Sequence, residues 1–115
     1  MSTPATSPAR KFYEEQIAML QPGRTDELID KHYANDAKLV SFQSIVRGRE
    51  DLKRYFQSYV AKLGKLDVLS LDQFAETEDS ILFEATVRTA LGVVKVYDAF
   101  VLQDGRATHH FTGVK

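Results

Sequence analysis

The sequence contains no cysteine, so disulfides, thiolate chemistry and cysteine-ligated metals are excluded. No apolar run approaches the roughly 20 residues that a membrane-spanning helix needs. Neither sign of charge is in excess, because 15 basic and 16 acidic residues leave a formal net charge of -1. A nucleic-acid-binding protein usually carries a basic stripe, and binding to anionic membranes also needs positive charge. We therefore expect neither nucleic acid nor a membrane as a partner.

The length and composition are those of one soluble globular domain. The chain has 115 residues, of which 43% are hydrophobic and 27% are charged. Residues 1–7 are mostly small and polar and include one proline, and they lack the apolar stretch of a secretory signal. We expect residues 1–7 to form a flexible arm and residues 8–115 to form a single domain. The absence of cysteine fits a cytoplasmic location.

Three helices are expected in the first half of the chain. Ser7 followed by Pro8 predicts a capped start for a helix over residues 8–20. A second helix is predicted from a cap at Thr25 to a break at Asn35. Apolar residues at helical spacing predict a third helix over residues 49–63, followed by a capping glycine.

Strands account for most of the remainder. Two short strands are predicted between the second and third helices, over residues 38–42 and 44–47. An antiparallel meander is predicted after the third helix, over residues 65–75, 81–89, 93–102 and 106–114. This order predicts an α+β fold in which amphipathic helices cover one face of a curved sheet.

Asp98 is the most informative residue in the sequence. Side chains alternate along a strand, so Asp98 shares its face with apolar neighbours, which are Val94, Val96, Phe100 and Leu102. A carboxylate on a core face must find a partner, border a cavity or take up a proton. Asp98 is therefore a candidate pocket residue.

The turn at Asp104-Gly105 pairs the Asp98 strand with a strand that carries two histidines. A two-residue turn would place Asp98 opposite Phe111. A three-residue loop with a glycine bulge would place Asp98 opposite His110 instead, with Thr108 facing the same side. In the second register an Asp98–His110 hydrogen bond is feasible, and such a pair suits acid/base chemistry.

Three segments resemble the nuclear transport factor 2-like superfamily, in its SnoaL-like and ketosteroid-isomerase-like branch. They are Tyr33-Ala34-Asn35-Asp36-Ala37, Val46-Arg47-Gly48-Arg49-Glu50-Asp51-Leu52 and Val96-Tyr97-Asp98-Ala99-Phe100, the last followed by the Asp104-Gly105 turn. The resemblance implies a cone-shaped fold in which the helices and a strongly curved, mostly antiparallel sheet enclose one pocket. It also implies a small-molecule ligand and a homodimer formed through the sheet. The largely apolar outer face of the Asp98 strand favours the same dimer.

The same resemblance assigns roles to a few positions. Asp98 corresponds to an acid of the isomerase oxyanion hole, and its partner tyrosine would fall near Gln16, with Tyr13 on the same helix. Ser41 stands at the position of the isomerase base, and serine does not accept a proton without a helper base. Ketosteroid-isomerase chemistry by that route is therefore not expected.

Other candidates for the pocket wall are polar or aromatic. They are Tyr13, Gln16, Ser41, Tyr55, Tyr59, Phe100 and Thr108. His32 lies beside Leu28 on a helix, and we expect a surface or rim histidine there rather than a catalytic one. The histidines and carboxylates show no metal-binding spacing and no phosphate loop is present, so we predict no metal and no cofactor. Two functions stay open: an acid/base enzyme of the isomerase, dehydratase or cyclase type, with Asp98 and His110 as its catalytic pair, and a non-catalytic binding or dimerisation module.

Overall fold

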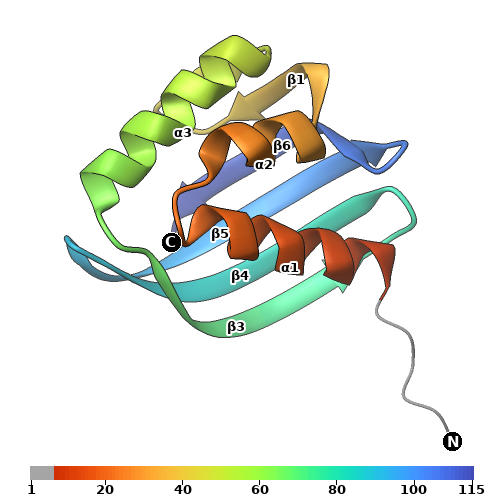
Figure 1. Cartoon of the computed structure of the whole chain (residues 1–115). Coiled ribbons are helices and arrows are strands. Elements are labelled where there is room, and N and C mark those ends of the chain that lie inside the picture. The colour runs from red at the N-terminus through yellow and green to blue at the C-terminus, as the bar shows by residue number, and fades with distance from the viewer. Residues whose placement is uncertain (1–6) are drawn as a thin grey trace, which may run out of the picture.

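The computed structural model describes residues 7–115, which form three helices and six strands (Figure 1). Residues 1–6 of the expected arm lie outside the described residues. The elements in chain order are α1 (Pro8–Leu20), α2 (Thr25–His32), β1 (Tyr33–Val40), β2 (Ile45–Arg47), α3 (Arg49–Leu63), β3 (Asp67–Glu76), β4 (Ser80–Thr89), β5 (Gly92–Gln103) and β6 (Arg106–Val114). The α+β class expected from the sequence is confirmed.

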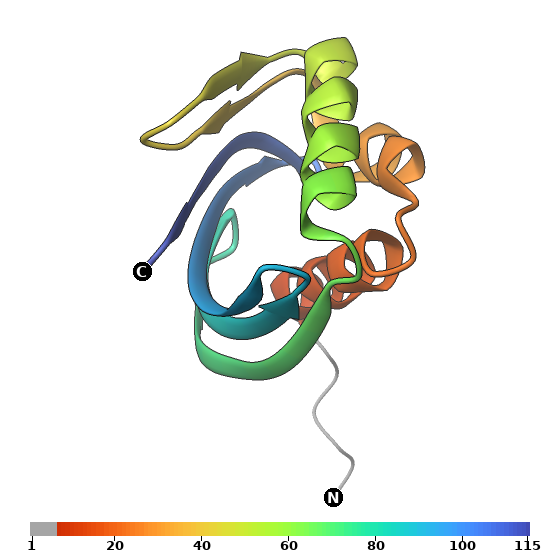
Figure 2. The same ribbon diagram turned by 90° about the vertical axis from the view of Figure 1, so that its left-hand side faces the viewer.

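One mixed sheet holds all six strands in the order β2-β1-β6-β5-β4-β3. Among the strands of residues 7–115, only β1 and β6 pair in parallel, and they are the first and the last of these strands. Figure 2 shows the sheet curving around an interior that the helices close on the other side. The side chains with no exposed surface lie between these two layers, including Leu28, Leu39 and Leu52.

Local sequence explains most of the element boundaries. The Ser7 side chain accepts a hydrogen bond from the Arg10 amide and caps α1 as expected. α3 ends as expected at Gly64, whose φ of 66° favours glycine. The expected cap at Thr25 is wrong, because Thr25 is the first helical residue and no side chain caps α2.

The junction between α2 and β1 also differs from the expectation. Tyr33 already has extended backbone, with φ of -120° and ψ of 137°. The helix therefore ends at His32, before the expected break at Asn35, and the strand begins at Tyr33 instead of Lys38. The β-branched and aromatic preference that predicts strands gave no signal for Asn35 and Asp36. These two residues lie in the irregular stretch between Tyr33 and Lys38, the positions at which β1 pairs with β6.

The β5–β6 hairpin has the two-residue turn that was one of the two alternatives, but its register at Asp98 differs from both. Its turn has two residues, with positive φ at both Asp104 and Gly105, so Gln103 pairs with Arg106. The register then shifts by one residue between Leu102 and Val101. The β6 residue opposite Asp98 is therefore Thr112, while His110 lies opposite Phe100.

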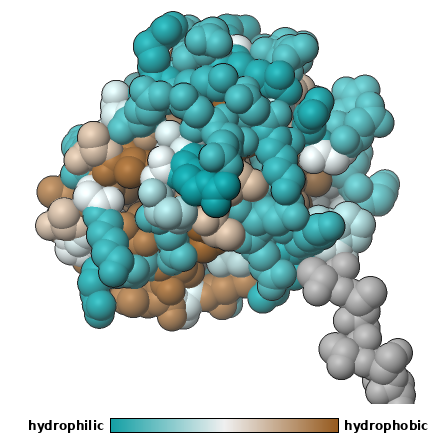
Figure 3. All heavy atoms as spheres, viewed as in Figure 1, coloured by the Kyte–Doolittle hydropathy of each residue, from teal (hydrophilic) through white to brown (hydrophobic). Residues whose placement is uncertain are grey.

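The outer face of the sheet carries several exposed apolar side chains, among them Leu82, Val93, Val101 and Phe111. On the helix side, Figure 3 shows hydrophilic side chains over α3 and hydrophobic ones gathered where β3, β4 and β5 curve. The homodimer through the sheet stays a prediction, as does the cytoplasmic location.

Among residues 7–115, no helix is both long enough and apolar enough to cross a lipid bilayer.

Candidate functional site

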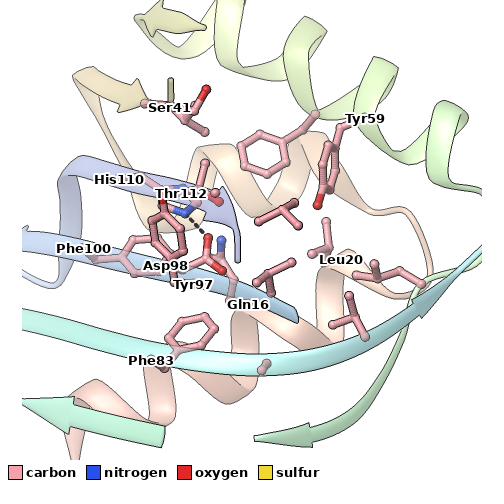
Figure 4. Close-up of a pocket in the computed structure, with 18 of the residues that line it drawn as sticks. Gln16, Leu20, Ser41, Tyr59, Phe83, Tyr97, Asp98, Phe100, His110 and Thr112 are labelled. Carbon is pink, nitrogen blue, oxygen red and sulfur yellow. Dashed lines mark hydrogen bonds and ion pairs between the residues drawn. The ribbon is translucent and has the colours of Figure 1, made fainter. Parts of the chain in front are cut away.

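A cavity of about 300 Å³ lies between the concave face of the sheet and the helices (Figure 4). Its wall is mostly apolar, with Leu20 from α1, Phe83 from β4 and Val96 from β5 as examples. Its polar residues come from both layers: Gln16, Ser41, Tyr55, Tyr59, Asp98, His110 and Thr112. A small apolar cavity with a few polar groups is the usual form of a small-molecule site.

Asp98 and His110 meet at the wall of this cavity. Oδ1 of Asp98 lies 2.7 Å from Nε2 of His110. The Asp98 side chain keeps 16% of its surface exposed and that of His110 keeps 5%. Of the two, the carboxylate is therefore the group more accessible from the cavity.

The hydrogen bond between Asp98 and His110 that was expected as feasible is present, but the two residues are not direct cross-strand partners. His110 lies diagonally across from Asp98, because its direct partner on β5 is Phe100. The His110 ring stacks on the Phe100 ring with centroids 4.1 Å apart and planes at 22°. This stacking orients the imidazole so that Nε2 faces the carboxylate two residues along β5.

The other nitrogen of His110 is also engaged. Nδ1 lies 2.8 Å from the hydroxyl of Tyr33, and Nε2 of Gln16 donates to the same hydroxyl at 3.1 Å. Tyr33 is fully buried, and burial raises the pKa of its hydroxyl far above the usual range, so the phenol stays protonated. Both ring nitrogens of His110 thus have partners, which suits a residue that holds Asp98 in place.

One carboxylate oxygen of Asp98 has no hydrogen-bond partner among residues 7–115. Its Oδ1 binds His110, and no hydrogen bond between residues of the 7–115 range involves its Oδ2. An ionised carboxylate oxygen can accept a proton or a hydrogen bond from a guest in the cavity.

Two tyrosines of α3 share the cavity with Asp98. Burial, and then the charge of Asp98, raise the pKa of Tyr59 to about 12, and the same two causes raise the pKa of Tyr55. Their rings lie nearly parallel with centroids 6.2 Å apart. Figure 4 shows Tyr59 on the helix side of the cavity, facing Asp98 across it. Both phenols remain protonated at neutral pH and can donate hydrogen bonds.

Of the other residues expected in the cavity wall, some line the cavity and some do not. Phe100 and Gln16 line the cavity. Tyr13 is buried against Phe83, with ring centroids 4.8 Å apart, and lies outside the lining. Thr108 also lies outside it, because the register shift turns its hydroxyl to the carbonyl oxygen of Val101.

Ser41 lines the cavity, but its hydroxyl belongs to a turn. It accepts hydrogen bonds from the backbone amides of Gln43 and Ser44, at 3.3 and 3.0 Å, and donates to the Ser44 carbonyl. This hydroxyl closes the β1–β2 connection and is not aimed at Asp98. Ser41 therefore offers the cavity no base.

His32 is not at the surface, and the expectation to the contrary is wrong. Its side chain is 3% exposed, stacks on Phe12 with ring centroids 4.3 Å apart, and lies 3.1 Å from Oε1 of Gln16. The hydrogen-bonding roles of His32 and Tyr33 were not predicted from the sequence. A signal was available in the shared helix side of His32 and Leu28, since Leu28 is fully buried.

No three histidine, aspartate or glutamate side chains gather as a metal site would require within residues 7–115.

Comparisons with known proteins identify the fold. No protein-family profile matches the chain, and no curated protein matches its sequence. Many solved structures do match. An NTF2-like protein from Anabaena variabilis has a TM-score of 0.78 at 16% identity, with 100% of this chain and 95% of that chain covered. A chain from Sinorhizobium meliloti described as a "putative polyketide cyclase" has a TM-score of 0.77 at 16% identity, over 90% of this chain and 94% of its own.

A third solved structure carries a ligand in its description. It is TerC co-crystallised with polyporic acid, with a TM-score of 0.77 at 16% identity, over 95% of this chain and 92% of that one. At these identities the likeness establishes the nuclear transport factor 2-like fold, which agrees with the resemblance found in the sequence.

Proposed function

We propose that this protein, with its nuclear transport factor 2-like fold, binds a compact and mostly apolar small molecule that carries one carbonyl group. We further propose that Asp98 exchanges a proton with that molecule. The observation that carries the proposal is the 2.7 Å contact between Asp98 and His110 at the wall of an apolar cavity. It fixes a carboxylate beside the cavity while leaving one of its oxygens without a partner among the described residues.

The proposed chemistry needs only groups that already line the cavity. Asp98 removes a proton from the carbon next to the carbonyl, and the electron pair of the broken C–H bond forms a C=C bond as the carbonyl becomes an enolate. Tyr59 donates a hydrogen bond to the enolate oxygen. Asp98 then returns its proton to carbon, so that atoms and charge balance over the cycle. His110 does not touch the ligand and serves to position Asp98.

The neighbours support the proposal in a limited way. TerC was co-crystallised with an organic acid, and the chain from Sinorhizobium meliloti is described as a cyclase, so the fold is compatible with small organic ligands. Fold alone does not determine function, and the argument for this chain rests on Asp98 and its surroundings.

A simple ketone tests the proposal without knowledge of the natural ligand. 2-Tetralone is apolar, carries one carbonyl and exchanges its α-protons slowly in D₂O. We expect the protein to accelerate this exchange, measured by proton NMR, and Asp98→Asn to lose the acceleration while still binding the ketone. Ser41→Ala is the matched control, since it also alters a polar cavity residue and should leave the rate unchanged. Equal rates for Asp98→Asn and the unaltered protein would refute the assignment of the base.

The second candidate is a binding module without catalysis. The engagement of the Ser41 hydroxyl by its own turn favours it, because no second base then faces Asp98 from that side. This candidate predicts saturable binding of 2-tetralone with no acceleration of exchange in any variant.

A further inference from the structure

A continuous series of hydrogen bonds runs from the cavity to the surface of the helical layer. It has five bonds, and the distances between their heavy atoms range from 2.7 to 3.2 Å. From the cavity outward its members are Asp98, His110, Tyr33, Gln16, His32 and Glu15. They come from β5, β6, β1, α1 and α2, so the series crosses the whole core.

The series is one proton short when every member has its ordinary charge. The two carboxylates at its ends supply no proton. Each of the four inner members, when neutral, places one proton into the series: one from each imidazole, one from the phenol and one from the amide. Four protons cannot make five hydrogen bonds. All five form only when one histidine carries an extra proton.

The amide of Gln16 decides which histidine that is. In the structure its Nε2 donates to Tyr33, so the phenol donates to Nδ1 of His110, and neutral His110 donates from Nε2 to Asp98. The extra proton then belongs on His32, between Gln16 and Glu15. Rotating the amide by half a turn reverses the three inner bonds, from His32 to Gln16, from Gln16 to Tyr33 and from Tyr33 to His110. The bonds to the two carboxylates keep their direction, so this arrangement leaves His32 neutral and requires the charge on His110 beside Asp98.

We propose that Gln16 is a positioning residue that couples the proton on His32 to the tautomer and charge of His110. The proposal builds on the Asp98–His110 pair of the proposed function and explains how conditions at the protein surface can reach that pair. Each histidine competes for the same proton through the orientation of one buried amide, and Gln16 is itself only 4% exposed.

The surroundings of both histidines fit such competition. His32 faces Glu15 from α1, and Lys31 of its own helix places Nζ 3.4 Å from the same Glu15 oxygen. Burial is the main cause that lowers the pKa of His32, and the bond to Glu15 opposes it. Burial and the bond to Glu15 thus act on the protonation of His32 in opposite directions.

At the other end, His110 contacts two titratable groups on neighbouring elements, and a third lies near Asp98. Asp98 lies on β5 and Tyr33 on β1, and each is hydrogen-bonded to one nitrogen of the imidazole. Tyr59 on α3 is close enough to Asp98 for the carboxylate to raise its pKa. Of these groups only Asp98 carries charge at neutral pH, so it is the group that would stabilise an extra proton on His110.

Nitrogen NMR of the imidazoles tests this coupling in the absence of any ligand, because each ring nitrogen reports whether it is protonated. We expect the His110 nitrogens to show an inflection at the pH at which His32 titrates. In Gln16→Met, which keeps the length of the side chain but removes the amide, that shared inflection should be lost. Tyr13→Phe is the matched control on the same helix and should retain it. Identical His110 titrations in the unaltered protein and Gln16→Met would overturn the proposal.

A second variant covers the case in which Gln16→Met does not fold. His32→Gln removes the titrating group but keeps an amide that can bond to Gln16, so it should fold and also lose the shared inflection from His110. Persistence of that inflection in folded His32→Gln would equally overturn the proposal. Because neither measurement uses 2-tetralone, the coupling can fail while exchange at Asp98 stands, and exchange can fail while the coupling stands.

Discussion

The hydroxyl of Tyr33 lies 2.8 Å from Nδ1 of His110, although the two residues are 77 positions apart in the chain. Tyr33 begins the first strand and His110 lies on the last, and the parallel pairing of β1 with β6 brings the two strands together. This one contact holds Nδ1 of the imidazole, so that Nε2 is directed at Asp98. The site is therefore built on a long-range strand pair and not on a local motif.

Removing the Tyr33 hydroxyl, a single oxygen atom, should lower the free energy of unfolding markedly. Tyr33→Phe leaves a nitrogen of His110 and the amide of Gln16 without their partner in a fully buried place. An unsatisfied buried polar group costs about 1–3 kcal/mol, and we expect a loss of unfolding free energy in that range by urea denaturation. Tyr13→Phe, another buried tyrosine, should lose less. Equal losses in the two variants would contradict the importance given to the Tyr33 contact.

Acid should destabilise the protein through His32. Burial holds the pKa of His32 below its usual value of 6.5. Between that lowered pKa and pH 6.5 the unfolded chain binds more protons than the folded one, so the unfolding free energy falls as the pH falls through this window. Urea denaturation of the unaltered protein and His32→Gln at several pH values measures this difference. The variant should show a shallower slope between pH 7 and the lowered pKa, and parallel slopes would contradict the prediction.

A larger side chain in the cavity should weaken ligand binding while changing the free energy of unfolding little. Ala85 lies on the concave face of β4, is 2% exposed and lines the cavity. Ala85→Leu should reduce the affinity for 2-tetralone at least about tenfold, while the unfolding free energy changes by about 1 kcal/mol or less. Thr86→Leu is the control, because Thr86 is the next residue and points to the other face. Isothermal titration calorimetry gives both affinities, and an unchanged affinity in Ala85→Leu would place the ligand elsewhere.

Gly113 should be sensitive to even a single methyl group. It pairs directly with Tyr97, and a Cβ at Gly113 would overlap the hydroxyl end of the Tyr97 ring. We expect Gly113→Ala to cost about 1–3 kcal/mol of unfolding free energy, since the ring must leave its packed position. In a Tyr97→Ala background the same substitution should cost less than half as much. Additive costs in this double-mutant cycle would contradict the proposed overlap.

Strand alternation was sufficient to predict the inward direction of Asp98. Its apolar neighbours on the same face, Val96 and Phe100, line the cavity as that alternation requires, although Tyr97, which alternation assigns to the other face, lines it too. Helix caps and apolar spacing likewise predicted α1 and α3 with their observed ends. These features depend on residues close together in the chain, and short-range rules describe them well.

The partners of His110 could not be predicted in the same way. The bulge next to Leu102 shifts the register of β6, and neither turn geometry considered from the sequence includes it. The bond to Tyr33 depends on a parallel pair of strands at opposite ends of the chain, which no local pattern encodes. Burial of His32 follows from the packing of α1 on α2, with Phe12 stacked on its ring.

The position of a bound guest is the most direct test of the account. A crystal structure with 2-naphthol, which has apolar rings and one hydroxyl, would show where that hydroxyl lies. We predict that the rings occupy the cavity beneath α3 and that the hydroxyl lies within hydrogen-bonding distance of Asp98 Oδ2, with the bond from Asp98 to His110 retained. A structure in which the carboxylate turns to bulk solvent, or in which the naphthol hydroxyl lies away from it, would contradict the central claim that Asp98 serves the cavity.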